Sequence, residues 1–270
     1  MQGGWEKLVM IAKVHNGIHF AAGGWPLVAG RPTLVFVHGS GGDHTLWQGQ
    51  IDALWGAANT LALDLPGHGA SRGPACDRVS AYARKVAALL ADLQVPRPVP
   101  CGLSLGGAIV LQLLLDRPLP LAGGVLMGTG ARLRVLPQII ETIQTRYAAF
   151  IDMLAEYGAS AHTDRALLAP VLSAAAACPA AVTAGDFTAC DRFDVMERLR
   201  EIAAPVLIIS GDDDRLTPPK YSAYLEQHIA GSRRVRVAAA GHLVPVEKPD
   251  AVNGALRTFL AEMLDAVHTK

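Results

Sequence analysis

The chain has 270 residues, of which 51% are apolar and 18% charged, and 24 Lys and Arg residues balance 24 Asp and Glu residues. The apolar fraction excludes a largely disordered chain. The zero net charge argues against a nucleic-acid-binding protein, which would carry a basic surplus. The length suffices for one large hydrophobic core, or for one core with an appendage.

Neither the N-terminus nor the apolar runs point to secretion or to a membrane. The first 14 residues contain one short apolar stretch, Leu8–Ala12, with no basic start, so we expect no signal peptide. The uncharged run Ala166–Ala184 is rich in Ala and broken by Pro170 and Pro179, which favours packed helix over a membrane span. We therefore expect a cytoplasmic protein with no membrane partner.

The predicted elements of the first half alternate between strands and helices. Leu8–Val14 and Ile18–Ala22 flank the hairpin signal Asn16-Gly17, and Thr33–Val37 and Leu61–Leu63 are the next predicted strands. A helix with Ser80 as its cap follows, then the strand Cys101–Leu103 after three prolines, then the helix Ala108–Leu115.

The second half continues the alternation after one interruption. Gly124–Met127, Val206–Ser210 and Arg234–Val237 are predicted strands, and residues 250–264 form a closing amphipathic helix. The stretch 130–204 shows only helical patterns (Leu136–Tyr157, Ala166–Ala177 and Asp194–Ile202). Strands separated by helices indicate a parallel sheet covered on both faces, an α/β fold. We expect residues 1–129 and 205–270 to form its core and residues 130–204 a helical cap inserted into it.

A motif for nucleophilic catalysis lies between a predicted strand and a predicted helix. Gly102-Leu103-Ser104-Leu105-Gly106 has the G-x-S-x-G spacing of a nucleophile elbow in the strand–turn–helix context that the elbow requires. The sharp turn strains the serine backbone, and the two glycines allow the turn to pack closely on neighbouring strands. Ser104 is the candidate nucleophile, and the Leu105 N–H at the helix start can stabilise a negative oxygen.

A carboxylate and a histidine follow at the ends of later strands. Asp212, Asp213 and Asp214 come directly after Val206–Ser210 and Gly211, where parallel sheets place their active sites. His242 follows the last predicted strand, 28 residues after Asp214. The chain order is therefore serine, acid, histidine, which is the order of α/β-hydrolases.

The chain resembles the α/β-hydrolase superfamily, and is most similar to its bacterial helical-cap branch of carboxylesterases and meta-cleavage-product hydrolases. Val35–Gly42 resembles the family's His-Gly oxyanion loop, and Asp64–Ser71 resembles the loop after the fourth strand. Gly211–Pro218 fits the family's acid loop, which favours Asp214 over Asp212 and Asp213. The resemblance implies a mostly parallel eight-stranded sheet flanked by helices, with a helical cap.

The resemblance also implies a mechanism without a metal or an organic cofactor. Ser104 attacks a carbonyl carbon, His242 transfers the proton, Asp214 holds the imidazole, and the backbone N–H groups of Ser40 and Leu105 form the oxyanion hole. Asp212 or Asp213 stays open as a substitute acid. The expected substrate is a small-molecule carboxylic ester with a largely apolar acyl or alcohol group.

Other activities of the same fold stay open. C–C bond hydrolysis of the meta-cleavage type needs a cation for a dienoate carboxylate, for which the cap offers four arginines: Arg132, Arg134, Arg146 and Arg165. Perhydrolase or haloperoxidase-like side activity uses the same triad, and a ligand-binding module without catalysis is the non-enzyme alternative. The oligomeric state, monomer or homodimer, is not decided by the sequence.

Several other polar or aromatic residues have structural interpretations. We expect His38 to shape the oxyanion loop by hydrogen bonds, and His68 and Asp64 to stabilise a polar turn. Trp47 either borders the pocket or packs beneath the loop. The four cysteines show no zinc-site or redox spacing and are interpreted as buried or incidental thiols: Cys76, Cys101, Cys178 and Cys190.

Overall fold

One eight-stranded sheet, in the order β1-β2-β4-β3-β5-β6-β7-β8, forms the centre of the protein. The computed structural model describes residues 10–268, with side chains described as far as Asp265. The strands are β1 (Ile11–His15), β2 (Ile18–Ala22), β3 (Thr33–Val37), β4 (Asn59–Leu63), β5 (Pro98–Leu103), β6 (Gly124–Met127), β7 (Val206–Gly211) and β8 (Arg233–Val237). β3 to β8 run parallel, and β1 and β2 form an antiparallel hairpin that joins β4. The predicted mostly parallel sheet is confirmed.

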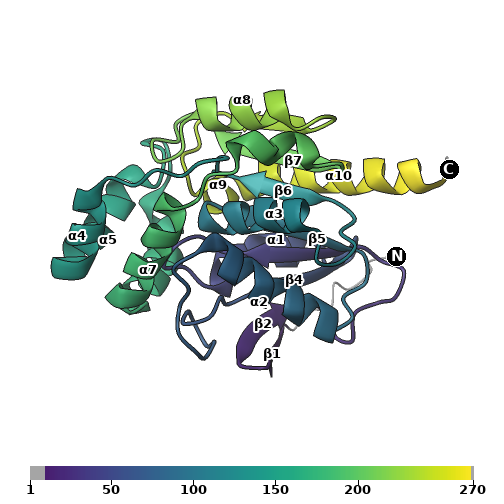
Figure 1. The fold of residues 1–270 in the computed structure, drawn as a ribbon, viewed down its shortest axis with the longest axis horizontal. Helices are drawn as coiled ribbons and strands as arrows, with labels where there is room; N and C mark the ends of the chain where they lie inside the picture. The colour runs from purple at the N-terminus through teal and green to yellow at the C-terminus, as the bar shows by residue number, and fades with distance from the viewer. Residues whose placement is uncertain (1–9, 269–270) are drawn as a thin grey trace, which may run out of the picture.

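The central strands are apolar on both faces because helices cover both faces. In β3, Leu34 and Phe36 belong to one core cluster, whereas Val35 and Val37 belong to the other. α2 (Val79–Asp92), α3 (Leu105–Asp116) and α8 (Pro219–His228) pack on the face of Val35, and α1 (Gln48–Leu54) and α10 (Pro249–His268) pack on the opposite face (Figure 1).

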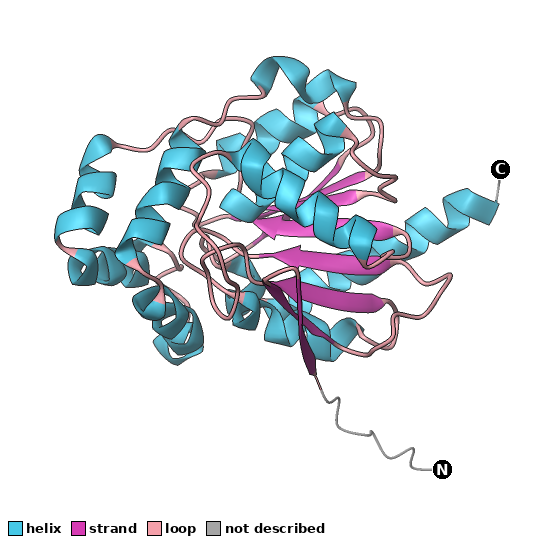
Figure 2. Cartoon of the chain, turned by 60° about the horizontal axis from the view of Figure 1, so that its bottom comes forward, coloured by secondary structure: helices cyan, strands magenta, loops and turns pink. Residues whose placement is uncertain are grey.

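Between β6 and β7 the described chain forms helices and no strand. Residues 130–204, called the helical insertion below, contain α4 (Pro137–Thr145), α5 (Tyr147–Tyr157), η2 (Arg165–Leu168), α6 (Ala169–Ala177), α7 (Ala180–Asp191) and η3 (Met196–Glu201). Figure 2 shows helices of the insertion beyond the arrowheads of the parallel strands. The insertion therefore lies over the carboxyl ends of the strands, where α/β sheets bind their ligands.

Two local predictions were wrong in detail. α2 begins at Val79 with Arg78 at its N-cap and no side-chain cap, so Ser80 lies inside the first turn. The predicted helical pattern Leu136–Tyr157 forms two helices, divided at Arg146, whose backbone is not helical (φ −144°, ψ 58°). The predicted end of the helical pattern Ala166–Ala177 is confirmed, because α6 ends at Ala177 and Pro179 stands in extended conformation before α7.

No single helix among residues 10–268 is both long and apolar enough to cross a bilayer. The segments Arg165–Ala177 and Ala180–Asp191 pass that test only as a pair, and they are bent by 101° relative to each other. Most of the Met1–Val14 segment on which the signal-peptide expectation rests, and the first residues of the predicted strand Leu8–Val14, lie outside the described residues.

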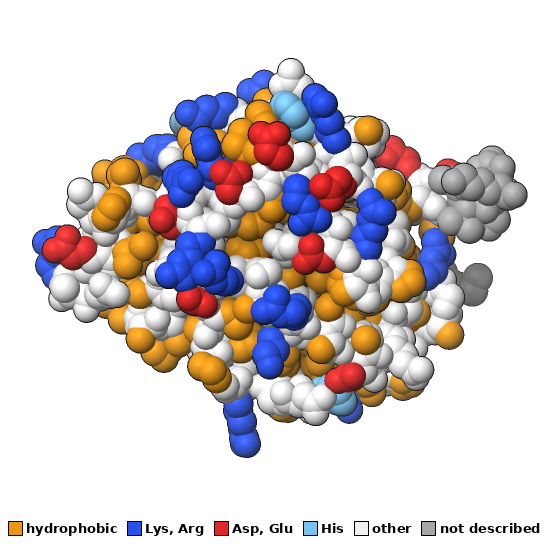
Figure 3. Space-filling view, viewed as in Figure 1, with side chains coloured by type: hydrophobic (Ala, Val, Ile, Leu, Met, Phe, Trp, Pro, Cys, Tyr) orange, Lys and Arg blue, Asp and Glu red, His pale blue; other side chains and the backbone are white. Residues whose placement is uncertain are grey.

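Charged side chains of both signs are interspersed on the face of the molecule shown in Figure 3. The surface ion pairs of the described residues include those of Arg198, which contacts the carboxylates of both Asp116 and Glu201. Exposed pairs of this kind contribute little to stability but keep large single-sign patches from forming.

Candidate active site

Ser104 lies at the tight turn from β5 into α3. Its backbone adopts φ 56° and ψ −116°, which a residue with a side chain rarely adopts and which is a source of strain. A Cβ on Gly102 would lie 2.1 Å from the Gly106 carbonyl, and a Cβ on Gly106 would lie 2.1 Å from the Val37 oxygen. The turn therefore requires glycine on both sides of Ser104, as the elbow motif predicts.

A cavity of about 210 Å³ brings Ser104, Ser40 and His242 to one wall. Most of the remaining wall is apolar and comes from the helical insertion, including Leu133, Val135, Ile139, Phe150, Met153, Leu154, Val171, Ala174, Ala175 and Phe187. Ser40, Ser104 and His242 thus come from the loops that follow the strands, and most of the apolar lining comes from the insertion. Such a cavity favours substrates with an apolar group next to a polar reacting centre.

Asp214 and His242 are hydrogen-bonded to each other beneath this cavity. Asp214 lies in the loop after β7 and His242 in the loop after β8, and the Asp214 Oδ2 to His242 Nδ1 distance is 3.0 Å. Both side chains are buried. Since an ionised carboxylate can only accept, Nδ1 carries the proton and Nε2 is left as the basic nitrogen.

Thr217 completes the surroundings of the carboxylate, and no motif in the sequence singles it out. Its hydroxyl donates to Asp214 Oδ2 over 2.7 Å and lies 3.2 Å from His242 Nδ1. The backbone N–H groups of Leu216 and Thr217 donate to Asp214 Oδ1 over 2.9 and 2.8 Å. Asp214 is therefore held in one orientation by donors on both oxygens.

Each charge of the Asp214–His242 pair offsets the free-energy cost of burying the other. Burial disfavours the carboxylate, but the imidazole and the donors around it outweigh this effect and lower the pKa of Asp214. Burial likewise disfavours the imidazolium, but the Asp214 charge outweighs it and raises the pKa of His242 above 6.5. A histidine so placed is a stronger base than a free one.

The two neighbouring aspartates have other partners. Asp212 pairs with Arg236 at 2.8 Å, and Asp213 accepts a hydrogen bond from the Ser160 hydroxyl at 2.5 Å. Of the three consecutive carboxylates, Asp214 is the one that contacts His242. This geometry favours the same residue as the sequence resemblance does.

The histidine loop is tied to the helical insertion by Glu247 of α9 (Val244–Glu247). Glu247 Oε2 accepts from the backbone N–H of Gly241, the backbone N–H of Ser160 and the hydroxyl of Thr163, at 2.9, 2.8 and 2.6 Å. The Leu243 N–H also donates to the Gly158 oxygen over 3.0 Å. One buried carboxylate thus joins residues on both sides of the boundary between core and insertion.

The predicted oxyanion loop follows β3. His38 donates from Nδ1 to the Gly39 oxygen (2.7 Å) and accepts at Nε2 from the Leu65 N–H (3.0 Å), so it has the structural role expected for it. Burial, together with the nearby His68, lowers the pKa of His38 to about 4, which keeps the ring neutral. Ser40 lines the cavity two residues further on, and Leu105 is the first residue of α3.

Arg134 is the one of the four candidate arginines that lines the cavity. Its guanidinium donates to the Asp191 carbonyl and is exposed, whereas Arg132 pairs with Asp194 on the surface. Arg146 and Arg165 are exposed and are not part of the cavity wall. At most one of these cations is therefore available to a bound carboxylate.

Trp47 and the cysteines have structural roles. Trp47 is fully buried and stacks on Phe36 with ring centroids 4.9 Å apart, so it packs beneath the loop. The cysteine thiols are all free, and Cys101, Cys178 and Cys190 are buried. Burial raises the pKa of Cys190, which lies at the cavity wall, to about 12, so its thiol is unreactive at neutral pH.

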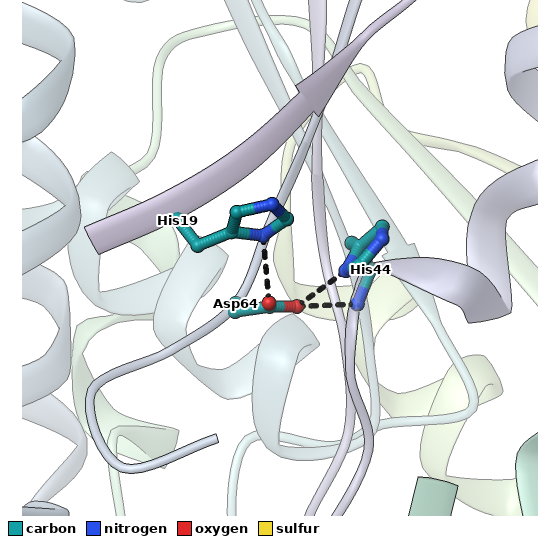
Figure 4. Close-up of side chains that lie close together, drawn as sticks. All are labelled: His19, His44 and Asp64. Atoms are coloured by element: carbon teal, nitrogen blue, oxygen red, sulfur yellow. Dashed lines mark hydrogen bonds and ion pairs between the residues drawn. The ribbon is translucent and has the colours of Figure 1, made fainter. Parts of the chain in front are cut away.

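Asp64 forms a second cluster with His19 and His44, on the loop side of β4 (Figure 4). The ligating atoms of these three residues lie within 4.8 Å of one another, and two imidazoles with a carboxylate can bind zinc. However, Asp64 accepts four N–H donors at 2.7–2.9 Å: both imidazole Nδ1 atoms and the backbone of His44 and Ala70. Hydrogen bonds alone therefore satisfy the cluster, and a metal ion would have to displace both imidazole protons.

Replacing Asp64 with Asn should destabilise the fold by about 3 kcal/mol or more, because it breaks a buried charged cluster. Burial opposes ionisation of Asp64, but His44 and the backbone donors lower its pKa overall, so its contribution is present above pH 4 and lost as pH falls further. The hydrogen bond to Asp64 raises the pKa of His44, whose contribution is present below pH 6.5 and lost as pH rises through its folded value.

Thermal unfolding from pH 3 to pH 9 tests this prediction, with the exposed Asp52→Asn as the control variant. The difference in Tm between wild type and Asp64→Asn should be largest between pH 4 and pH 6.5 and shrink on both sides. A difference that does not depend on pH would contradict the assignment of the charges.

The family assignment rests on the whole sheet and its loops. Residues 34–255 match the model of the Alpha/beta hydrolase family, which spans β3 to α10 and includes the insertion. The chain belongs to the alpha/beta hydrolase family. The expected superfamily and fold are thereby confirmed. Ser104 lies at the turn between β5 and α3 within the matched residues.

The relatives of this hydrolase include enzymes named for action on esters and lactones. It is 27% identical over 228 residues to a pimeloyl-[acyl-carrier protein] methyl ester esterase of Nitrosomonas europaea, covering 78% of this chain and 88% of the relative. It is 29% identical over 250 residues to 3-oxoadipate enol-lactonase 2 of Acinetobacter baylyi, covering 86% and 90%. A solved structure of a thermophilic esterase is 31% identical, with a TM-score of 0.80 over 94% of this chain and 98% of that chain.

Proposed function

We propose that this hydrolase cleaves carboxylic esters of small to medium, largely apolar compounds through Ser104, His242 and Asp214. The hydrogen-bonded pair of Asp214 and His242, below a cavity that also exposes the strained Ser104, is the observation that carries the proposal. The esterases and the lactonase among its relatives support the same class of reaction, since a lactone is a cyclic ester.

The first half-reaction forms an acyl-enzyme. Ser104 Oγ attacks the ester carbonyl carbon while His242 Nε2 accepts the hydroxyl proton, and Asp214 stabilises the resulting imidazolium. The carbonyl oxygen becomes an oxyanion, which accepts hydrogen bonds from the backbone N–H groups of Ser40 and Leu105. His242 then gives its proton to the departing alcohol as the C–O bond breaks.

The second half-reaction releases the acid. A water molecule gives a proton to His242 Nε2 and attacks the acyl carbon, and the bond to Ser104 Oγ breaks with return of the proton. All groups in this cycle belong to the chain, so the mechanism calls on no cofactor. The helical insertion acts as a cap whose apolar wall binds the acyl or alcohol group away from water.

Hydrolysis of p-nitrophenyl esters from acetate to decanoate tests the proposal. We expect turnover to peak at a short or medium chain, because the cavity of about 210 Å³ admits a limited acyl length. A folded protein that cleaves none of these esters and whose Ser104 resists a fluorophosphonate would contradict the proposal and favour a ligand-binding role.

C–C bond hydrolysis is the second candidate, and Arg134 at the cavity wall is the observation in its favour. Much faster turnover of a ring-cleavage dienoate than of any ester would establish C–C bond hydrolysis. Loss of that preference in Arg134→Gln, with ester turnover retained, would identify the guanidinium as the carboxylate-binding group.

A plot of kcat/KM against pH should rise on its acid side, and the midpoint of this rise should lie above pH 6.5. The neutral form of His242 is the base, and its raised pKa keeps the inactive imidazolium populated to a higher pH than for a free histidine. Initial rates on a non-ionising ester, followed by titration of the released acid, measure this rise. Circular dichroism over the same range shows that the protein stays folded, and a flat profile through pH 6.5 would contradict the role of His242.

A further inference from the structure

A carboxylate outside the proposed triad reaches from the helical insertion into the core. Asp186 lies on α7, and its side chain is fully buried. Its Oδ2 accepts from the Gly41 N–H at 2.9 Å and lies 2.8 Å from His68 Nε2, and its Oδ1 accepts from the Tyr82 hydroxyl at 2.6 Å. Three separate segments of the core therefore meet at this one side chain.

His68 balances the charge of Asp186. Its other nitrogen, Nδ1, lies 3.2 Å from the Pro66 carbonyl oxygen, which can only accept a hydrogen bond. Both neighbours of the ring are acceptors, so the surroundings favour protonation of both nitrogens, which gives the ring a positive charge. Burial disfavours this charge, but Asp186 outweighs burial and raises the pKa of His68. A buried ion pair with these extra hydrogen bonds fixes the position of its members.

The contact with Gly41 connects Asp186 to the oxyanion loop. Gly41 follows Ser40 directly and has a left-handed backbone (φ 68°). The hydrogen bond from its N–H sets the orientation of the Ser40–Gly41 peptide, next to the Ser40 N–H that the mechanism uses. Thr183, one turn earlier on α7, lies close to Gly41: a Cβ there would be 3.1 Å from Thr183 Oγ1. Helix α7 thus packs directly against the loop.

We propose that Asp186 is a positioning residue for the oxyanion hole, which makes the helical insertion part of transition-state stabilisation as well as a cover. The inference rests on the proposed function. A donor stabilises an oxyanion only when it is already aimed at the site where the charge forms. Asp186 supplies this alignment through Gly41, while Tyr82 and His68 hold Asp186 itself in place.

Asp186→Asn is the decisive variant, because it keeps the size of the side chain and removes the charge. We expect kcat on the best p-nitrophenyl ester to fall by about 10- to 100-fold, less than the loss of an entire oxyanion donor, with KM changed by less than about threefold. Asp152→Asn, at an exposed position of α5 in the same insertion, is the matched control and should keep the wild-type kcat.

A trifluoromethyl ketone that matches the acyl chain separates oxyanion alignment from general damage to the pocket. It forms a tetrahedral adduct on Ser104, so its Ki should rise by the same factor by which kcat/KM falls. The product carboxylate binds without a tetrahedral centre, and its Ki should stay close to the wild-type value. An equal loss of affinity for the ketone and for the product carboxylate would overturn the inference. A rise in KM with kcat unchanged would also overturn it.

Tyr82→Phe keeps the test decisive if Asp186→Asn does not fold. It removes one hydrogen bond to Asp186 Oδ1 and leaves the carboxylate in place, so kcat should fall by a smaller factor with KM unchanged. Wild-type kcat in this variant would then overturn the inference. Wild-type protein without ester turnover or Ser104 labelling would instead mean that the proposed function itself has failed.

Discussion

Ser104→Ala is expected to lower kcat for ester hydrolysis by about 10⁴-fold or more, since it removes the atom that forms the acyl-enzyme. The Asp214–His242 hydrogen bond does not involve the serine hydroxyl, and the apolar lining of the cavity comes from other residues, so substrate binding should be retained. Steady-state kinetics on the preferred p-nitrophenyl ester measure the loss. A fluorophosphonate probe should label the wild-type protein and leave the variant unlabelled.

Ser173→Ala is the matched control, because Ser173 is exposed on α6. It should keep both the turnover and the labelling of the wild type. If Ser104→Ala retains turnover within about tenfold of the wild type, a different group carries the chemistry and the assignment of the nucleophile is wrong.

Asp214→Asn should lower kcat by about 10⁴-fold, although it changes neither the size nor the packing of the side chain. The amide can present its NH₂ group to His242 Nδ1, which then loses its proton to Nε2, and the base faces Ser104 in the wrong tautomer. The backbone N–H groups of Leu216 and Thr217 can hold the amide oxygen at the position of Oδ1, which places the NH₂ group at the position of Oδ2, next to His242 Nδ1. Kinetics across pH 6–9 with the same ester measure the effect.

The two preceding aspartates supply the controls for this prediction. Asp212→Asn loses a surface pair with Arg236, and Asp213→Asn weakens one hydrogen bond from Ser160, so each should retain kcat within about threefold. A large loss at either position with little loss at Asp214 would transfer the role of the acid to the neighbouring carboxylate.

The sheet was predictable because its strands are buried on both faces. Thr33–Val37 and Gly124–Met127 form strands with the predicted bounds, and short continuous apolar runs are typical of strands that helices cover on both sides. The elbow was also predictable, because a Cβ on either of the glycines around Ser104 would lie 2.1 Å from backbone atoms. The glycines of the motif therefore indicate this close packing. A pattern of a few consecutive residues therefore sufficed to predict each of these two features.

The contacts that organise the site were not visible in the sequence. Asp186 and Gly41 are 145 residues apart, and Glu247 and Ser160 are 87 apart, so no spacing pattern connects them. Asp186 lies in an Ala-rich helix with little amphipathic pattern, and a single aspartate there looks like an ordinary surface residue. Ser80 shows the opposite error, since a favourable capping residue was outweighed by the packing that starts α2 at Val79.

Glu247 joins the helical insertion to the loop that carries His242. Its Oε2 holds the N–H of Gly241, next to His242, together with Ser160 and Thr163 of the insertion. Separation of the insertion from the core near this point would break the hydrogen bonds of Glu247 to Ser160 and Thr163 and would leave the buried carboxylate with the Gly241 N–H as its remaining donor. Met153, Tyr157 and Leu216 line the cavity and are exposed, so this part of its wall offers a route for substrate exchange that leaves the hydrogen bonds of Glu247 intact.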